Sequence, residues 1–343
     1  MLPRHLALLV RRSALGRDPV LLQGPRGAGK TTLARSEFPD RLYVDLSDPA
    51  DLEAARRAPE AFLVRLRRPA VVDELQRCPE LVRHLSERLG PMPVVFVADT
   101  RVRLPMETFE LHRPTRAERM MRPPMPIGML GRFVPARDEA RIPDRAPAFP
   151  EPREYLWRDV PRLIALGEPD RFERFAAMVA ARSGGLLHQQ AMARELGVAH
   201  RTVARWLDAL DACFLTLRLE PFEHGLGRRL AKRPKLHFLG PAASFETEVV
   251  SEIYRNARHA GLSPELRYWR DSNGLEAPLI VRAEPGSAAV PCAIAEEPGP
   301  AEEVRLRRWM ELAGVGRGAV IGRAPGGPDS RLGRLPRYAL TDF

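Results

Sequence analysis

The chain reads Val20-Leu21-Leu22-Gln23-Gly24-Pro25-Arg26-Gly27-Ala28-Gly29-Lys30-Thr31-Thr32-Leu33 over residues 20–33. An apolar run leads directly into Gly-x-x-x-x-Gly-Lys-Thr and then into a segment of helical character, which is the strand, loop and helix context of a phosphate-binding P-loop. The glycines let successive backbone N–H groups turn toward phosphate oxygens, and the start of the helix adds partial positive charge. The motif is too complete for a chance glycine-rich turn, so it predicts a nucleoside triphosphate site.

Each polar residue of this motif has an expected task. Lys30 is expected to reach the β- and γ-phosphates and to be catalytic, and the Thr31 hydroxyl to bind Mg²⁺. Only three of the 54 basic Lys and Arg residues are lysines, and one of them stands at this position, where a compact ammonium is required. The predicted nucleotide-binding residues are Gly24, Gly27, Ala28, Gly29, Lys30, Thr31 and Thr32.

A second motif completes a hydrolytic site. Residues 70–74 read Ala-Val-Val-Asp-Glu, an apolar strand that ends in two carboxylates. Asp73 is predicted to bind the Mg²⁺ shell, and Glu74 to activate the water that attacks the γ-phosphate. A further strand over residues 93–98 ends at Asp99 and Thr100, which are either γ-phosphate sensors or an ordinary strand-end turn.

These strands alternate with helical segments, which predicts an α/β fold. The P-loop domain is expected to be a parallel sheet with helices on both faces, and the nucleotide is expected at the carboxyl ends of its strands. A strand over residues 41–46 and an amphipathic helix over residues 1–10 belong to this domain.

The composition of the chain indicates its type of partner and its cellular location. The net charge of +10 favours a polyanionic partner such as nucleic acid, although an arginine-rich coding bias would raise it too. Cys78, Cys213 and Cys292 are widely spaced and match neither a disulfide framework nor a zinc site, so a cytoplasmic location is expected. No segment is apolar for long enough to span a membrane.

The motifs together resemble the prokaryotic AAA-type P-loop ATPases. The resemblance rests on Gly24-Pro25-Arg26-x-x-Gly29-Lys30-Thr31-Thr32, on Val44-Asp45-Leu46-x-Asp48-Pro49 and above all on Asp73-Glu74-x-Gln76-Arg77-x-Pro79-Glu80. It implies an ATP hydrolase with ATP and Mg²⁺ as cofactors. Members of the family carry a winged helix and a restriction-endonuclease-like domain after the ATPase, and their sites are often completed by a neighbouring subunit, which raises a homo-oligomer as an expectation.

The end of the fourth strand departs from the family pattern. The family has Thr-Gly-Ser there, and this chain has Ala98-Asp99-Thr100-Arg101. Arg101 and Arg103 are the candidates for an arginine finger, the alternative being solvated surface charges.

The middle of the chain falls into two parts. Nine prolines between Arg113 and Arg153 predict an irregular connector, followed by a helical lid, so that the ATPase domain covers residues 1–125 and the connector and lid residues 126–182. Residues 183–241 are predicted to form a winged helix-turn-helix. A first helix ends at Gly197, and the second buries Val203, Trp206, Leu207 and Leu210.

This unit is a candidate for DNA contact, but helix-turn-helix units also serve in protein packing. Two strands over residues 214–219 and 235–239 would form the wing, with a basic segment between them that either contacts phosphates or is a solvated loop. The DNA-binding candidates are His200, Arg201, Thr202, Arg205, Arg228, Arg229, Lys232 and Lys235.

Residues 242–343 are predicted to form a small α/β domain of the nuclease-like kind, with its chemistry lost. The resemblance implies Glu-Val-Asp on one strand and Glu-x-Lys on the next, whereas this chain has Pro278 and alanines at those places and no lysine after Lys235. Two functions remain open: an ATPase that binds or remodels DNA, or a nucleotide-switched regulatory protein whose winged helix binds a protein partner.

Overall fold

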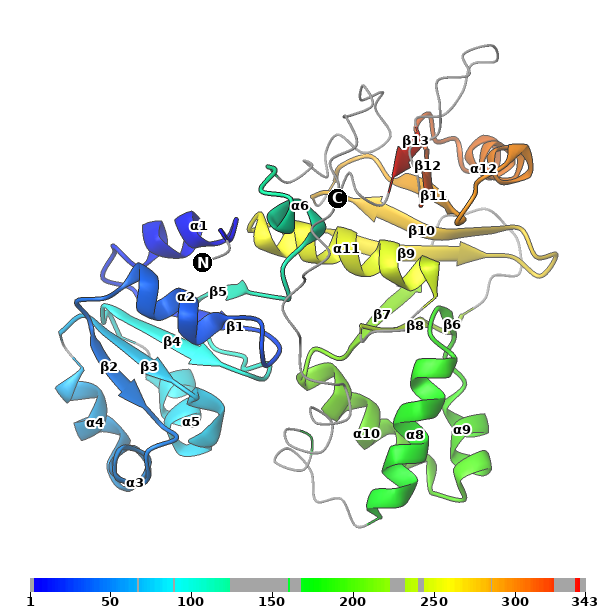
Figure 1. The fold of residues 1–343 in the computed structure, drawn as a ribbon. Coiled ribbons are helices and arrows are strands. Elements are labelled where there is room, and N and C mark those ends of the chain that lie inside the picture. Colours follow the sequence, from blue (N-terminus) through cyan, green and yellow to red (C-terminus); the bar gives the residue numbers. More distant parts are fainter. Residues whose placement is uncertain are drawn as a thin grey trace.

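The computed structural model describes most of the chain (Figure 1). The described residues are 3–66, 68–88, 90–123, 160, 168–222, 232–239, 244–284, 286–323 and 337–339. The predicted connector after residue 123 and the candidates Arg228 and Arg229 lie outside them. Within the described residues, no helix has both the length and the apolar character needed to cross a membrane.

The first unit is built on a five-stranded parallel sheet of order β2-β3-β4-β1-β5. Its strands are β1 (Val20–Gln23), β2 (Leu42–Asp45), β3 (Ala70–Asp73), β4 (Val94–Ala98) and β5 (Glu107–Glu110). The first four lie where the sequence predicts them. The fifth is not predicted, because its short sequence carries two glutamates and lacks the apolar run of a buried strand.

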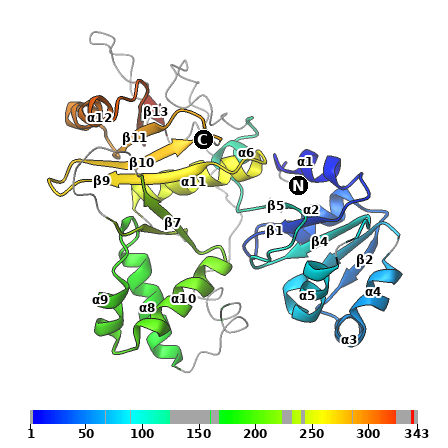
Figure 2. The same ribbon diagram turned by 180° about the vertical axis from the view of Figure 1, so that it is seen from behind.

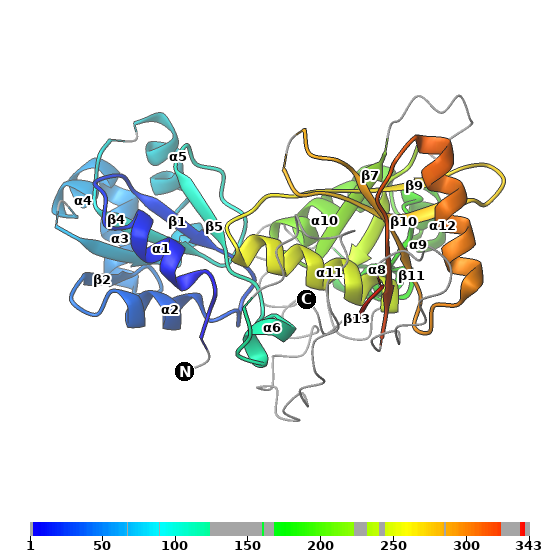
Figure 3. The ribbon, with the colours of Figure 1, turned by 90° about the horizontal axis from the view of Figure 1, so that it is seen from above.

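Helices cover both faces of this sheet, as predicted. They are α1 (Ala7–Ser13), α2 (Lys30–Glu37), α3 (Pro49–Arg57), α4 (Pro59–Arg65), the 3-10 turn η1 (Leu75–Arg77) and α5 (Pro79–Glu87). The short helix α6 (Arg116–Arg119) follows β5 and lies away from the sheet (Figure 1). Figure 3 shows α2 on one side of the strands and α5 on the other. Alternate residues of the buried strands supply the two cores: Val72 and Phe96 pack with α3, α4 and α5, whereas Val71 and Val95 pack with α1 and α2.

Local signals set the ends of these helices. Proline is the first residue of α3, α4 and α5, where its missing N–H costs no hydrogen bond. Asp48 caps α3 by accepting a hydrogen bond from the backbone N–H of Ala50 at 2.7 Å. Thr115 and Glu118 form a reciprocal capping box around α6.

The second unit begins with a helical cluster. It contains α8 (Pro169–Ala181), β6 (Gly185–Leu186), α9 (Gln189–Leu196), α10 (His200–Ala212), β7 (Thr216–Pro221) and β8 (Lys235–Phe238). Gly197 ends α9 in the left-handed conformation at φ 65°, which permits the tight turn into α10. The four apolar residues predicted on the second helix are all buried.

One sheet runs from this helical cluster into the C-terminal part of the chain. Strand β7 pairs with β8 in the antiparallel direction and with β9 (Glu265–Arg270) in the parallel direction, which joins eight strands in the order β13-β12-β11-β10-β9-β7-β8-β6. Figure 2 shows β7 running from the helices to β9. The remaining strands are β10 (Glu276–Arg282), β11 (Val290–Ile294), β12 (Ala319–Gly322) and β13 (Arg337–Ala339).

Two helices pack on the C-terminal part of this sheet. Helix α11 (Phe245–His259) buries Val249 and Ile253 against Leu279 and Val281, and α12 (Pro300–Ala313) buries Trp309 with Ile280. Because neighbouring residues of β10 point to opposite faces, the two helices cover opposite sides. Helix α11 also lies beside α6 of the first unit (Figures 1 and 3).

Candidate functional site

The loop between β1 and α2 has the backbone shape that its glycines permit. Gly24 has φ 156°, and a Cβ at this position would collide with the carbonyl of Leu111. Gly29 caps α2 in the left-handed conformation at φ 91°. No other residue type fits both positions without strain, so the loop lies tightly against β5 and directs the start of α2 toward the strand ends.

Lys30 is the first residue of α2 and is only 3% exposed. Its ammonium donates to the carbonyl oxygens of Gly24 and Pro25 at 2.8 Å each. It also lies 2.6 Å from a carboxylate oxygen of Asp99, at the end of β4, and Arg26 lies 3.5 Å from the other oxygen. Of the two sensor candidates, Asp99 is therefore in contact with the P-loop lysine, and Thr100 is buried beside it in the chain.

Thr31 and Asp73 meet, as a magnesium site requires. The Thr31 hydroxyl donates to Oδ2 of Asp73 at 2.7 Å, and the Tyr43 hydroxyl from β2 donates to the same oxygen. Burial, with the hydrogen bond to Asp73 next, raises the pKa of Tyr43 to about 12, so this phenol keeps its proton at neutral pH. A hydroxyl and a carboxylate at one point are hard oxygen ligands of the kind that Mg²⁺ prefers.

Glu74 follows Asp73 and adopts a left-handed conformation at φ 60°, which is uncommon for a residue with a side chain. Burial raises the pKa of its carboxyl, and the negative charges of Asp99 and Asp73 add to the shift. Gln76 holds this carboxylate: its amide nitrogen donates to Glu74 at 2.9 Å, and its amide oxygen accepts from the backbone N–H of Asp99 at 3.0 Å. A raised pKa and a fixed orientation suit a general base.

The sequence missed three residues of this site. Gln76 stood inside the quoted Asp-Glu-x-Gln-Arg motif but had no role there, and Tyr43 is an ordinary strand residue by its pattern. Arg4 lay in a predicted amphipathic helix, and nothing in the sequence connected it with the P-loop. Its guanidinium donates to the carbonyl of Ala28, the central residue between two P-loop glycines.

Arg101, a candidate for an arginine finger, makes its contacts within the chain. Its guanidinium lies 2.7 Å from Glu110 and 3.2 Å from the Tyr254 hydroxyl on α11, and its backbone N–H donates to Ala212 at the end of α10. It also stacks on the ring of Phe214. Arg101 therefore holds the two units together and is not a solvated surface charge.

The described DNA-binding candidates fall into a group at the surface and one buried residue, Lys235. His200, Arg201 and Arg205 are exposed on α10, with Thr202 half-buried beside them. A surface pocket of about 360 Å³ opens at the beginning of α9 and α10. None of the described residues that line it is acidic, and five are basic: His188, Arg194, His200, Lys232 and Arg233.

The prediction for Lys235 is wrong. It was expected to contact DNA phosphates, but it lies on β8 with 3% exposure, and its ammonium donates to Glu246 at 2.8 Å and pairs with Glu276. The strand turns this side chain inward, where two carboxylates neutralise it. One of its partners, Glu246, lies in the first turn of α11.

Comparisons with known proteins support a P-loop domain in the first unit. Residues 16–98 match the model of a family described as an AAA domain, and residues 151–242 match that of a domain of unknown function (DUF8612). The uncharacterized proteins Rv2008c of Mycobacterium tuberculosis and Mb2031c of Mycobacterium bovis are each 30% identical to the chain over 259 residues. The match covers 69% of this chain and 58% of each relative, so the chain spans little more than half of their length. Residues 16–98 thus form an AAA-type nucleotide-binding domain with a P-loop.

Proposed function

We propose, from the AAA-type P-loop domain at residues 16–98, that the chain is a Mg²⁺-dependent ATP hydrolase. The observation that carries the proposal is the 2.7 Å hydrogen bond between Thr31 and Asp73, with Glu74 as the next residue of the chain. It joins the two motifs of the sequence at the end of the sheet where the P-loop lies.

Each residue has a defined task in this reaction. The backbone amides of the P-loop and the ammonium of Lys30 bind the phosphates, and Thr31 and Asp73 would hold Mg²⁺. The bound ion would neutralise charge on the phosphate oxygens. Glu74 takes a proton from the attacking water, and Gln76 orients its carboxylate toward this task. When ATP binds, its phosphates replace Asp99 as the partner of Lys30, and Asp99 remains at the end of β4 as the sensor.

Replacing the base separates binding from hydrolysis. Glu74→Gln keeps the shape of the side chain but removes the proton acceptor, so we expect ATP affinity within twofold of the wild type and turnover reduced by about a hundredfold or more. Glu80→Gln is the matched control, because Glu80 belongs to the same motif and is only partly buried on α5. A Glu74→Gln protein with wild-type turnover would assign the base elsewhere.

DNA is the partner that the second unit favours. The helix pair α9 and α10 with the strands β7 and β8 has the order of a winged helix, and the pocket at the start of both helices carries five basic side chains. Phosphates suit such a pocket, and their contribution weakens steeply with salt. ATPase rate and DNA affinity, measured against salt with single-stranded, duplex and branched DNA, test this role.

The alternative is a nucleotide switch whose winged helix binds a protein. It is favoured if ATP hydrolysis is slow, is not stimulated by any DNA, and DNA binds only in low salt. For the C-terminal domain we propose a nuclease-like fold without nuclease chemistry, since β10 carries Pro278 and since Glu276 is paired with Lys235. Metal-dependent DNA cleavage by the wild-type chain would overturn this. A homo-oligomer and a cytoplasmic location are also part of the proposal, the latter supported by three buried cysteines that form no disulfide.

A further inference from the structure

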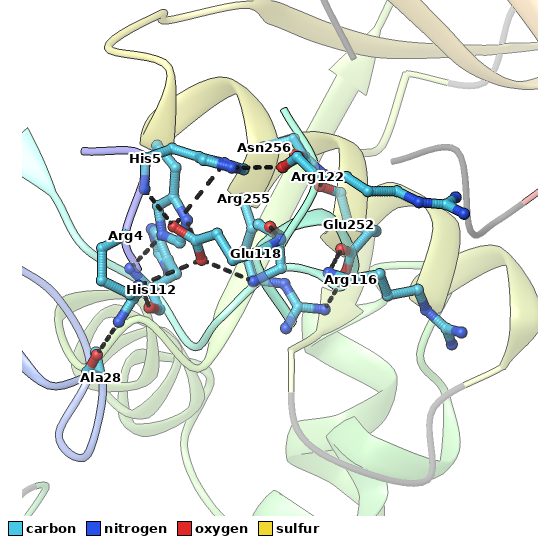
Figure 4. Close-up of polar contacts among 12 residues, drawn as sticks. Arg4, His5, Ala28, His112, Arg116, Glu118, Arg122, Glu252, Arg255 and Asn256 are labelled. Carbon is cyan, nitrogen blue, oxygen red and sulfur yellow. Dashed lines mark hydrogen bonds and ion pairs between the residues drawn. The ribbon is translucent and has the colours of Figure 1, made fainter. Parts of the chain in front are cut away.

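A buried arginine, Arg4, donates a hydrogen bond to the backbone of the P-loop. Arg4 precedes α1, and its side chain is only 6% exposed. Its guanidinium reaches three acceptors: the carbonyl oxygens of Ala28 and His112 at 2.5 Å each, and the Glu118 carboxylate at 3.2 Å (Figure 4). Such a fork links the nucleotide loop to the chain segment between β5 and α6.

The bond to Ala28 bears on phosphate binding through peptide geometry. The carbonyl of Ala28 and the N–H of Gly29 belong to one planar trans peptide unit, so they point in opposite directions. Gly27 and Gly29 flank this residue with φ 74° and 91°, and glycine backbones have wide conformational freedom. Arg4 therefore fixes the direction of an N–H in the cradle that the loop forms for phosphates.

Arg4 is itself held by Glu118, a carboxylate without solvent exposure. Glu118 also accepts the backbone N–H groups of His5 at 2.8 Å and Thr115 at 3.0 Å. Burial alone would raise the pKa of this carboxyl, but the hydrogen bond from His259 and the positive charge of Arg4 hold it well below its usual range. Glu118 is thus a charged anchor at neutral pH.

The anchor extends into the second unit through His259, the last residue of α11. Its ring is fully buried, with Nδ1 lying 3.1 Å from Glu118 and Nε2 accepting the backbone N–H of His112 at 2.9 Å. Because Nε2 accepts, the ring proton resides on Nδ1 and is donated to Glu118. A continuous chain of contacts therefore runs from the P-loop through Arg4 and Glu118 to α11.

We propose that Arg4 is a positioning residue for nucleotide binding, and that Glu118 and His259 couple its position to the docking of α11. The proposal rests on the proposed ATP site. Coupling between two sites is reciprocal, so nucleotide binding also strengthens the contact between α11 and the first unit. The second unit would in this way respond to the nucleotide without touching it.

The first test compares Arg4 with Arg41, a partly buried arginine, in the whole chain. Arg4→Ala is expected to weaken binding of a fluorescent ATP analogue with Mg²⁺ by about tenfold, the usual effect of losing a charge-assisted hydrogen bond. Arg41→Ala is the matched control, since Arg41 also donates to backbone carbonyls, of Ala14 and Pro93, and stacks on Phe38, away from the P-loop. Arg4→Lys, which keeps the charge without the fork, should recover part of the affinity. An unchanged affinity in Arg4→Ala, or an equal loss in Arg41→Ala, overturns the proposal.

The second test starts from α11 and remains decisive if Arg4→Ala does not fold. His259→Leu removes the donor to Glu118 and should weaken the analogue several-fold, whereas His259→Gln, whose amide can donate and accept, should restore it. In the double variant with Arg4→Ala, the loss should not exceed that of Arg4→Ala alone, because both act along one path. Additive losses, or no loss in His259→Leu, contradict the coupling.

Hydrogen exchange distinguishes the proposed coupling from a purely structural role of Arg4, because a structural role alone would not make amide exchange in α11 depend on nucleotide. Nucleotide should slow amide exchange along the last turn of α11 in the wild type and leave it unchanged in Arg4→Ala. A wild-type chain that binds no ATP would refute the proposed function itself. A chain that binds ATP without any protection of α11 would refute only the coupling.

Discussion

The ammonium of Lys30 lies 2.6 Å from the carboxylate of Asp99, so the P-loop lysine and the tip of β4 form an ion pair inside the proposed phosphate site. The γ-phosphate of ATP would carry the same sign of charge as Asp99 and would compete with it for Lys30. Asp99, the proposed sensor, should therefore oppose nucleotide binding, so its removal should increase the affinity for ATP.

Asp99→Asn should tighten nucleotide binding. The amide keeps the size of the side chain but removes a negative charge beside the phosphates, so we expect ATP affinity to rise roughly fivefold. Titration with a fluorescent ATP analogue measures it. Asp40→Asn, an exposed turn residue, is the control, and a weaker affinity in Asp99→Asn would show that the carboxylate assists binding.

Tyr43→Phe should raise the Mg²⁺ requirement. The phenol donates to the Asp73 oxygen that also accepts from Thr31, and removing a partner that orients a metal ligand costs about tenfold in metal affinity. ATPase rate against Mg²⁺ concentration measures the shift. Tyr268→Phe, which loses a hydroxyl bonded to the Arg233 carbonyl, should leave the Mg²⁺ dependence unchanged, and an equal shift in both would disprove a local effect.

Lys232 and Lys235 should behave differently although they lie three residues apart. Lys232→Ala removes an exposed cation from the basic pocket and should lower the salt slope of DNA affinity by about 0.9. Lys235→Ala leaves Glu246 and Glu276 without their common partner and should reduce the free energy of unfolding by about 3 kcal/mol. DNA titrations at several salt concentrations and urea unfolding separate the two effects. The assignment is wrong if Lys232→Ala leaves the salt slope intact.

Acid should weaken the fold through His112. Burial lowers the pKa of this ring to about 4, although its contact with Glu110 opposes the shift. The unfolded chain takes up the proton near pH 6.5, so His112 contributes its full stability above that pH and loses it as the pH falls toward 4. We expect a loss of about 2 kcal/mol at pH 5 from this residue. His112→Gln should flatten the dependence of urea unfolding on pH between 7 and 5, whereas His84→Gln, at a partly exposed position on α5, should not. Identical pH profiles for the wild type and His112→Gln would rule out this account.

The sequence by itself determined the P-loop, the strand that presents Asp73 and Glu74, and the burial of Val203, Trp206, Leu207 and Leu210. Each depends on residues within one turn, one strand or one helix, and the periods of helix and strand are local properties of the chain. The predicted positions of four parallel strands followed from the same local patterns.

Only the tertiary structure decided the partners of charged groups. Lys235 was expected to contact DNA as part of the basic segment of the wing, and it is buried because β8 carries it toward α11 and β10. The continuous eight-stranded sheet arises from the pairing of β7 with β9, which no local sequence pattern predicts.

Arg4 shows the limit most clearly. It lies 114 residues from Glu118 along the chain, and Glu118 lies a further 141 from His259. The sequence fixes the charges of such residues, but their distances depend on how sheets and helices pack. A buried charge is stable only beside its partner, so the choice of partner belongs to the folded chain as a whole.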